Sequence, residues 1–471
     1  MDGLSLTDDS AEAVGTLSKA VAPSWLLNGE NIAPATGVRV CIIGGGFVGL
    51  VTAAGMAQAG HTVTCVEKDT RKVSDLVKGR VGIYERHLPE LVRANLERKR
   101  LRFHDDLTEW ADDQDVFVVS VGTPSRPDGT ADLTALHGVM ESLAGLVRTG
   151  QVVVIKSTVP VGTAEWARTI VNSRNGHERP IPIVSNPEFL REGTAVYDYF
   201  HPQRIVVGGD DPDAVERVVQ LYRVGLAHAA PIVTTDNKTA ELIKYASNVY
   251  LATRVAFINE LSGICDSFGI DIGDVSAAMG MDPRIGSDYL DAGPGFGGSC
   301  LPKDLNAYIT EAKRAGLDLT LAPSVQRANS RQFERVVEKT RAMLDGALEG
   351  SLVGVLGLAF KAQTQDMRDS PAVHVIQRLI AGGARVQAYD PAAMVEAGSI
   401  LPAVRCCPDA PSVASGADAI LILTEWPEFQ LLDWATMRGA MRRPNIIDAR
   451  NLLAPESMKR LGFHYTGMGQ R

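Results

Sequence analysis

The fold of this chain is decided by the stretch Val38-Arg-Val-Cys-Ile-Ile-Gly-Gly-Gly-Phe-Val-Gly49. Its apolar first half predicts a short strand, and the residues that follow, to about 60, predict a helix. The junction is a G-x-G-x-x-G motif, in which the first glycine permits a tight turn, the second lets backbone approach a pyrophosphate and the third allows close helix packing. The helix N-terminus would stabilise the phosphate charge. We therefore expect a dinucleotide to bind at Gly44, Gly46, Phe47, Val48 and Gly49.

A second strand is predicted at residues 61–66 and ends at Glu67. An acid at this distance from the glycines accepts hydrogen bonds from the ribose hydroxyls of NAD and repels the 2′-phosphate of NADP. Arg71 and Lys72 follow closely, and we expect Lys72 to lie at the same cofactor site. NAD is therefore the expected cofactor; the alternative is a similar fold that binds no nucleotide.

Two further buried strands are predicted at residues 115–121 and 151–157. Ligands of such parallel sheets lie outside the carboxyl ends of the strands. Thr123 and Thr158 follow these ends and are candidates for contacting the nicotinamide ribose or a catalytic water. An ordinary turn or helix cap explains them equally well.

A pair of acids follows the short apolar run 181–184, in Ser185-Asn-Pro-Glu-Phe-Leu-Arg-Glu-Gly193. If this segment is one helical turn, Glu188 and Glu192 share a face. Two such carboxylates beside a reactive group can divide the proton transfers of a reaction. A solvated helix face is the alternative.

The reactive group is predicted in Gly293-Pro-Gly-Phe-Gly-Gly-Ser-Cys-Leu-Pro-Lys-Asp304, a glycine-rich approach to one thiol. Pro302 suits the first position of a helix, so the dipole and Lys303 should favour the thiolate of Cys300, the form that attacks carbonyl carbon. The alternative is a small buried apolar residue. The other five cysteines form no metal-ligand spacing and no disulfide framework, which indicates a reducing compartment and no metal.

Composition narrows the class of protein. The chain has 471 residues and a net charge of -9, which argues against a nucleic-acid partner and against binding to anionic lipid. No apolar stretch is long enough to span a membrane, and the N-terminus is acidic where a signal peptide would be basic. We expect a cytoplasmic enzyme.

The order of the patterns predicts an α/β protein with two Rossmann-like, doubly wound parallel-sheet domains joined by a central helical segment. We expect a flexible extension at 1–36, an NAD-binding domain at 37–230, a helical domain at 231–335 and a second sheet domain at 336–471. The helical run 240–252 places Lys244 and Asn248 on one face. A long helix here would link the two sheet domains, and the apolar pattern of the helices at 237–328 favours a dimer formed through them.

Several motifs occur in one order along the chain: Asn186-Pro-Glu-Phe-Leu-Arg-Glu192, Leu242-Ile-Lys-Tyr-Ala-Ser-Asn248, the Cys300 segment, Gly357-Leu-Ala-Phe-Lys361 and Asp366-Met-Arg-Asp-Ser-Pro371. Together they resemble the UDP-glucose/GDP-mannose 6-dehydrogenase family over about residues 37–455. The segment 122–133 and Gly293-Pro-Gly-Phe296 look most like the branch that acts on UDP-glucose. The branches for GDP-mannose and for UDP-N-acetylhexosamines are the nearest rivals.

The resemblance implies a four-electron oxidation of the C6 alcohol of a nucleotide sugar to a carboxylate, with two NAD molecules used in turn. Lys244 and Asn248 would contact the C6 oxygen, and Asp304 would support the proton network. Cys300 would form a thiohemiacetal and then a thioester, which water held by Glu192 and Thr158 would hydrolyse. Glu188 would be a supporting acid.

The same resemblance implies the remaining ligands and a homodimer. Lys303, Glu192 and Arg368 would lie at the cofactor, and Arg284 would enter the site from the partner subunit. The nucleotide sugar would contact Glu188, Phe189, Leu190, Arg191, Lys244, Asn248, Tyr289, Phe296, Gly297 and Lys361. Two alternatives of other classes are a single-hydride dehydrogenase of the 6-phosphogluconate or 3-hydroxyacid type and a non-catalytic nucleotide-sugar sensor.

Overall fold

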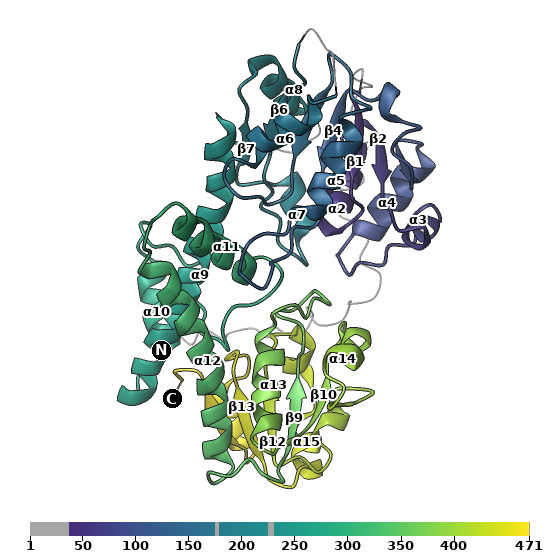
Figure 1. Ribbon diagram of the computed structural model, residues 1–471. Helices are drawn as coiled ribbons and strands as arrows, with labels where there is room; N and C mark the ends of the chain where they lie inside the picture. Colours follow the sequence, from purple (N-terminus) through teal and green to yellow (C-terminus); the bar gives the residue numbers. More distant parts are fainter. Residues whose placement is uncertain (1–36, 175–178, 225–229, 471) are drawn as a thin grey trace, which may run out of the picture.

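The computed structural model describes residues 37–174, 179–224 and 230–470, so the extension expected at 1–36 lies outside the described residues. Two sheet domains lie at opposite ends of the molecule (Figure 1). The long helices α9 (Asn237–Phe268) and α12 (Leu321–Met343) run between them. This arrangement confirms the expected α/β architecture of two Rossmann-like domains joined by helices.

The first sheet has the strand order β3-β2-β1-β4-β5-β6-β7-β8. Its first six positions follow the order of a dinucleotide-binding fold. Ser185 pairs with Gly208 in antiparallel fashion, and β8 is parallel to β7, so the last two strands run opposite to the others. The strands are β1 (Arg39–Ile43), β2 (Thr62–Val66), β3 (Leu101–His104), β4 (Val116–Val119), β5 (Val152–Ile155), β6 (Ile183–Ser185), β7 (Ile205–Gly208) and β8 (Ile232–Thr235).

Helices cover both faces of this sheet. Along β1, Val40 and Ile42 pack into one apolar core, whereas Cys41 and Ile43 pack into the other. Burial on both faces is typical of parallel strands between helix layers. The covering helices are α2 (Phe47–Gln58), α3 (Thr70–Leu76), α4 (Leu88–Glu97), η2 (Ala111–Asp113), α5 (Thr134–Leu143), α6 (Thr163–Val171), α7 (Ala195–Phe200) and α8 (Pro212–Arg223).

The second sheet has the order β11-β10-β9-β12-β13-β14, and all its pairings are parallel. It repeats the order of the first six strands of the other sheet. Its strands are β9 (Leu352–Leu356), β10 (Arg385–Tyr389), β11 (Arg405–Cys406), β12 (Ala419–Ile422), β13 (Asn445–Asp448) and β14 (His464–Gly467). Its helices are α13 (Pro371–Ala381), α14 (Met394–Ile400), η3 (Pro411–Ala414), η4 (Pro427–Leu431), α15 (Trp434–Ala440) and α16 (Pro455–Arg460).

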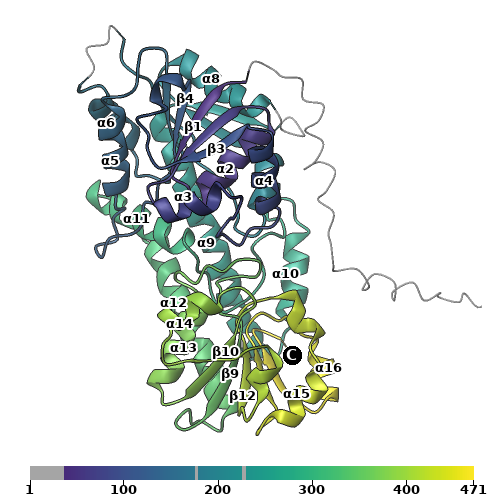
Figure 2. The same cartoon turned by 90° about the vertical axis from the view of Figure 1, so that its right-hand side faces the viewer.

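The central helices connect the two sheets (Figure 2). Asp236 accepts a hydrogen bond from the backbone N–H of Thr239 and so begins α9, which ends at Gly269 with a positive φ of 65°. Against α9 pack α11 (Leu301–Arg314), α12 and the shorter α10 (Ile272–Gly280). The strand β8 pairs with β7 in the first sheet and ends at Thr235, past the domain limit expected at 230. The helix α12 ends at Met343, past the limit expected at 335.

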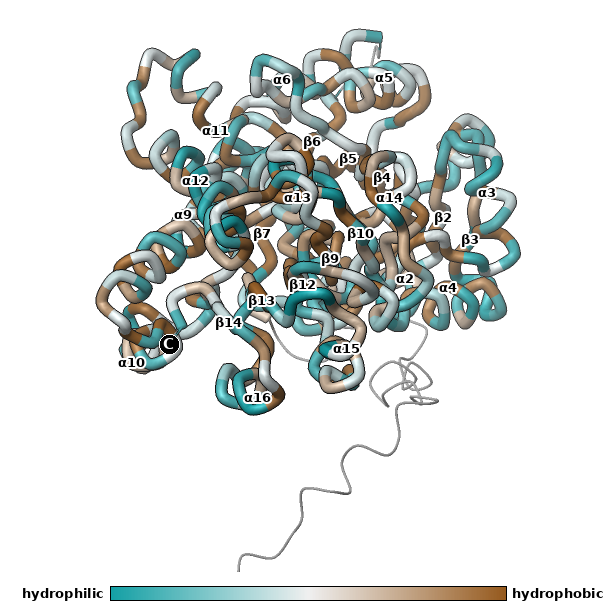
Figure 3. The backbone as a smooth tube through the Cα atoms, turned by 90° about the horizontal axis from the view of Figure 1, so that it is seen from below, coloured by the Kyte–Doolittle hydropathy of each residue, from teal (hydrophilic) through white to brown (hydrophobic). Residues whose placement is uncertain are grey.

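Apolar residues concentrate on the central strands of the two sheets, whereas outer helices such as α3 and α16 are largely hydrophilic (Figure 3). One helix departs from this pattern. Five large apolar side chains of α9 are exposed: Leu242 near its start, and then Tyr250, Phe257, Ile264 and Phe268, which recur at spacings of seven and four residues. Such spacing places them along one side of the helix.

Candidate active site

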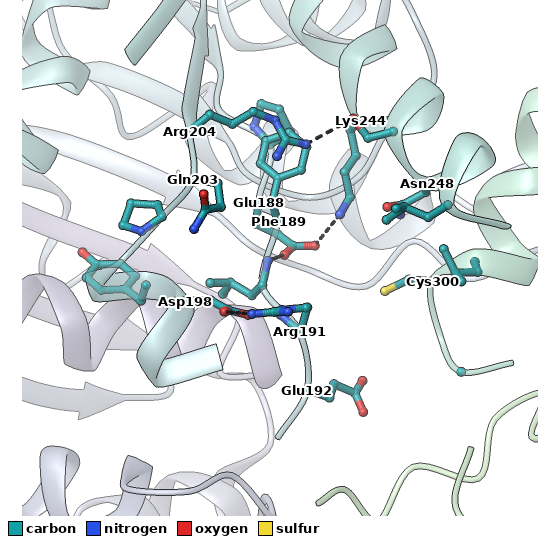
Figure 4. Close-up of a pocket in the computed structure, with 18 of the residues that line it drawn as sticks. Glu188, Phe189, Arg191, Glu192, Asp198, Gln203, Arg204, Lys244, Asn248 and Cys300 are labelled. Atoms are coloured by element: carbon teal, nitrogen blue, oxygen red, sulfur yellow. Dashed lines mark hydrogen bonds and ion pairs between the residues drawn. The ribbon is translucent and has the colours of Figure 1, made fainter. Parts of the chain in front are cut away.

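A cleft of about 590 Å³ opens beside α9, between the first sheet domain and the loops of the second. Figure 4 shows side chains from several separate segments pointing into it. The lining residues that the sequence singled out are Glu188, Phe189, Leu190, Arg191, Glu192, Lys244, Asn248, Tyr289, Gly297, Cys300 and Lys361.

Cys300 is the N-cap residue of α11, and its thiol lies on the cleft side of this helix end (Figure 4). Pro302 is therefore the second residue of the helix and not the first. Burial raises the pKa of the thiol, and the charge of Glu188 raises it further, while Lys244 lowers it. The expected bias toward thiolate is thus wrong for the ligand-free protein, because desolvation outweighs the nearby positive charge.

Lys244 and Glu188 form an ion pair inside the cleft, with 3.1 Å between Nζ and Oε1. Both side chains are almost fully buried, at 4% and 6% exposure. Burial lowers the pKa of Lys244, but the neighbouring acidic groups, Glu188 first, raise it by more, so the lysine stays charged. The other carboxylate oxygen of Glu188 accepts the backbone N–H of Leu190 at 2.6 Å.

Asn248 lies one helical turn beyond Lys244 on α9, as the spacing predicts. Its Nδ2 donates a hydrogen bond of 2.6 Å to Oδ2 of Asp304, which is fully buried on α11. The ammonium of Lys303 contacts the other oxygen of Asp304 at 2.5 Å. Lys303 therefore forms its ion pair with Asp304, and Lys244 is the cation that lowers the pKa of the Cys300 thiol.

Glu192 does not share a helical face with Glu188. Residues 186–191 have no regular secondary structure, and the two carboxylates diverge (Figure 4). Glu192 accepts hydrogen bonds from Ser299 Oγ at 3.2 Å and from Thr364 Oγ1 at 2.8 Å. Burial and the charge of Asp366 raise its pKa, against smaller opposing contributions from Thr364, Arg368 and Lys361.

The glycine loop between β1 and α2 has the form that a dinucleotide requires. A Cβ on Gly49 would lie 1.8 Å from the carbonyl oxygen of Gly44, so only glycine fits there. Around Gly46, which caps α2 ahead of Phe47 and Val48, no atom lies within 4 Å of where a Cβ would be. Glu67 Oε2 accepts the backbone N–H of Gly45 at 3.1 Å and contacts Lys72 Nζ at 3.5 Å. The residues present therefore fit NAD.

Thr123 and Thr158 come from the ends of neighbouring strands and meet. Thr123 Oγ1 donates to the carbonyl oxygen of Thr158 at 2.7 Å. This bond joins the two loops that follow β4 and β5, at the carboxyl edge where a cofactor binds.

Three further side chains line the cleft: those of Arg191, Lys361 and Tyr289. Arg191 forms a two-pronged ion pair with Asp198, at 3.0 and 2.7 Å. Burial lowers the pKa of Lys361 despite the nearby acids Glu192 and Glu425. Tyr289 lines the cleft with a positive φ of 62°.

Phe296, Arg284 and Arg368 are among the predicted residues that do not line the cleft. Phe296 is buried in an apolar cluster of the central helices. Arg284 pairs with Asp282 and is 87% exposed, on the outside of this protomer. Arg368 pairs with Asp366 and lies 3.7 Å from Glu192.

Sequence reasoning missed Arg204, Thr364 and Glu85. The guanidinium of Arg204 lies 3.7 Å from the ring centroid of Phe189 and donates to Ser247 Oγ at 3.2 Å. None of the three belongs to a periodic pattern. Only Thr364 had a signal in the sequence, because it lies between the motifs at 357–361 and 366–371.

Within the described ranges, His, Cys, Asp and Glu side chains form no group suited to a metal ion. No helix of that same part of the chain is long and apolar enough to cross a membrane.

Three family models match the chain in order. They are the NAD binding, central and UDP binding domains of the UDP-glucose/GDP-mannose dehydrogenase family, at residues 38–225, 238–331 and 354–455. UDP-glucose 6-dehydrogenase of Pseudomonas aeruginosa is 41% identical over 92% of this chain and 98% of its own length. The chain belongs to the UDP-glucose/GDP-mannose dehydrogenase family.

Solved structures of family members have the same fold. A UDP-glucose dehydrogenase from Pyrobaculum islandicum is 36% identical, with a TM-score of 0.84 over 92% of this chain and 98% of its own. UDP-D-ManNAc dehydrogenase from Pyrococcus horikoshii is 27% identical, with a TM-score of 0.82 over 92% and 99%. As a member of this family the chain is an NAD-dependent oxidoreductase with a nucleotide-sugar substrate, as the resemblance implied.

Proposed function

We propose that this enzyme oxidises the C6 alcohol of UDP-glucose to the carboxylate of UDP-glucuronate. The observation that carries the proposal is the meeting of a thiol, a buried lysine and an amide in one cleft: Cys300, Lys244 and Asn248. A single hydride transfer needs no thiol, whereas oxidation to the acid needs a tetrahedral adduct from which a second hydride can leave. The relatives of 41% and 36% identity are named for UDP-glucose, and that of 27% for UDP-D-ManNAc.

The first oxidation converts the alcohol to an aldehyde. NAD supplies the hydride acceptor, once for each of the two oxidations. Lys244 and Asn248 hold the C6 oxygen, and their positive charge and N–H dipole stabilise the negative charge that develops on it. Asp304 accepts one N–H of the Asn248 amide and thereby fixes the amide, whose second N–H serves the C6 oxygen.

The second oxidation uses Cys300. Its sulfur bonds to C6 of the aldehyde, the carbonyl oxygen gains a proton, and a thiohemiacetal results. Loss of that proton and of a second hydride leaves a thioester on the sulfur. The thiol must lose its own proton for attack, and Lys244 favours this because its charge lowers the thiol pKa.

Water then cleaves the thioester. The oxygen bonds to C6, the C–S bond breaks, and the sulfur regains a proton. Glu192 is the base for this water, with Thr158 as a second contact. Because burial raises its pKa, Glu192 is a stronger base than an exposed glutamate. Glu188 holds Lys244 in the cleft by their ion pair.

Glu67 and Lys72 face the adenosine ribose, and Arg368, Lys303 and Thr123 lie toward the nicotinamide half. The nucleotide sugar contacts Phe189, Leu190, Arg191, Tyr289, Gly297 and Lys361, with Phe296 acting from the core. The domain limits are proposed at Asp236 and after Met343, where the first sheet and the central helices end.

The enzyme acts as a homodimer through the exposed apolar side of α9. Tyr250, Phe257, Ile264 and Phe268 would otherwise leave large apolar side chains along one side of α9 in water. The exposed guanidinium of Arg284 would exchange its ion pair with Asp282 for contacts in a partner's cleft. A cytoplasmic location is also part of the proposal, because all six cysteines are free and a reducing compartment keeps them so.

The test is the yield of NADH and its dependence on the thiol. Two NADH should form per UDP-glucose, and Cys300→Ser should bind UDP-glucose and NAD normally but lose most turnover. Initial rates on UDP-glucose, GDP-mannose and UDP-N-acetylglucosamine decide the substrate. A yield of one NADH per sugar, or a Cys300→Ser variant with normal turnover, would contradict this proposal and favour a dehydrogenase that transfers a single hydride.

A further inference from the structure

Glu85 is a buried carboxylate that takes no part in the proposed reaction steps. It lies in the loop between α3 and α4 and is only 5% exposed. Oε2 accepts the backbone N–H of Gly193 at 2.6 Å, and Oε1 accepts that of Ala195 at 2.9 Å. Glu85 thus holds the turn that follows Glu192, although more than 100 residues separate them in the sequence.

Thr364 holds Glu192 from the other domain. It lies in the loop between β9 and α13 and is 3% exposed. Its Oγ1 donates directly to the Glu192 carboxylate, and it accepts the backbone N–H of Asp366 at 3.1 Å. The loops also touch at Gly193, where a Cβ would lie 2.7 Å from the carbonyl oxygen of Gln363.

The contacts at Glu85 have an energetic cost. Burial raises its pKa to about 7, against the lowering effect of the backbone N–H groups and of Lys361. Burying a carboxylate costs free energy of desolvation, so an apolar side chain of similar size would stabilise the folded protein more. Its geometric effect is specific, because it fixes the backbone at Gly193 and hence the direction in which the Glu192 side chain leaves the chain.

We propose that Glu85 and Thr364 are positioning residues that together hold Glu192 beside Ser299 and Cys300 for the attack of water on the thioester. Glu85 acts through the backbone from the NAD-binding domain, and Thr364 acts through a side-chain hydrogen bond from the UDP-binding domain. The inference rests on the proposed role of Glu192 as the base of that step. Hydrolysis therefore requires both domains to contact the same loop.

The variants that test this are Glu85→Gln, Thr364→Val and Thr364→Ser, with Glu192→Gln as the reference. We expect Glu85→Gln and Thr364→Val to lower kcat by about 10- to 100-fold, as small displacements of a reacting group do. KM for UDP-glucose should change by less than about twofold, since neither residue lines the cleft. Thr364→Ser keeps the hydroxyl and should retain most of the turnover.

The readout that separates positioning from a general structural role is the covalent intermediate. During turnover, Glu85→Gln, Thr364→Val and the reference Glu192→Gln should all accumulate sugar on Cys300, visible by intact mass. A matched control is Glu241→Gln, because Glu241 is also buried and accepts two backbone N–H groups, those of Gly162 and Ala164. That variant should show no accumulated thioester.

The outcomes of these measurements distinguish a positioning role from the alternatives. If Glu192→Gln accumulates thioester while folded Glu85→Gln and Thr364→Val do not, the positioning role is wrong and the proposed reaction stands. If Glu85→Gln does not fold, the two variants of Thr364 still test the inference. Equal turnover of Thr364→Val and Thr364→Ser would overturn it. If Glu192→Gln itself accumulates nothing, its role in hydrolysis fails, and the inference fails with it.

Discussion

Asn248 donates a hydrogen bond of 2.6 Å to Asp304, so an amide on α9 is fixed by a fully buried carboxylate on α11. Two helices that begin far apart in the sequence thus meet at the point where the C6 oxygen is proposed to bind. The acid has little freedom of its own, because Lys303 contacts its other oxygen.

Replacing this amide by an acid should disable the first oxidation. In Asn248→Asp a second carboxylate would face Asp304, and the donor to the developing oxyanion would be lost. We expect kcat to fall by about 100- to 1,000-fold, the usual effect of losing such a donor. Binding of NAD, measured by titration calorimetry, should not change. A variant with more than a tenth of wild-type kcat would contradict the oxyanion role.

The raised pKa of Cys300 predicts slow alkylation at neutral pH. Burial and Glu188 both favour the thiol, so the rate of modification of Cys300 by iodoacetamide should climb as pH rises above the ordinary value of 9.0. Glu188→Gln should raise the rate at pH 7.5, because it removes a negative charge from the thiol. Peptide mass spectrometry separates Cys300 from the exposed Cys406. A Glu188→Gln variant that reacts more slowly would refute this electrostatic account.

Glu67 should determine the choice of cofactor. The Glu67 carboxylate accepts the N–H of Gly45, and a 2′-phosphate bound beside this carboxylate would meet its negative charge. The wild-type enzyme should prefer NAD over NADP by about tenfold or more in kcat/KM, and Glu67→Asn should narrow the ratio. Lys72→Ala is the matched control, which should leave the preference in place. Equal efficiency of the wild-type enzyme with both cofactors is the contrary result.

Glu241 should make stability depend on pH. Burial raises its pKa to about 7, against backbone hydrogen bonds from Ala164 and Gly162. The folded state therefore holds this proton more tightly than the unfolded state, and that contribution to stability is lost as pH rises from about 4.5 to 7. Glu241→Gln does not titrate, so the Tm difference, variant minus wild type, should rise by a few degrees between pH 5 and 8. A constant difference over this range contradicts the shift.

The apolar side of α9 predicts a dimer. Phe257→Glu should place a charge in the interface and yield monomers by light scattering, whereas Val395→Glu, at a site of α14 that is 88% exposed, should leave the mass of a dimer. Mixing Arg284→Ala with Cys300→Ala tests whether the cleft is shared. Activity should return in mixed dimers that carry one intact site; no recovery after proven subunit exchange would show that each subunit works alone.

Local patterns were sufficient to predict much of the fold and part of the site. The strand, glycines and acid from Val38 to Glu67 form a contiguous unit, so their arrangement depends on nearby residues alone. Lys244 and Asn248 share a helical face because their spacing is that of one turn. Family membership confirms the cofactor that the first unit predicted.

Other features depended on contacts between distant segments and could not be predicted. Residues 186–191 follow an irregular path, so spacing could not show that Glu188 turns to Lys244 while Glu192 turns to Thr364. The thiol of Cys300 was expected to be acidic, but its burial is a property of the assembled cleft. The reversed direction of β7 and β8 likewise depends on a pairing that no local pattern encodes.

The single helix α9 carries both Lys244, inside the cleft, and the exposed apolar residues from Tyr250 to Phe268. An α-helix turns by about 100° per residue, so one residue inserted between Asn248 and Tyr250 would rotate the apolar side by that angle relative to the lysine. Substitutions could then accumulate along α9, but insertions and deletions could not. Length variation among enzymes built this way should therefore fall in the loops and at the chain ends, and α9 should keep its register.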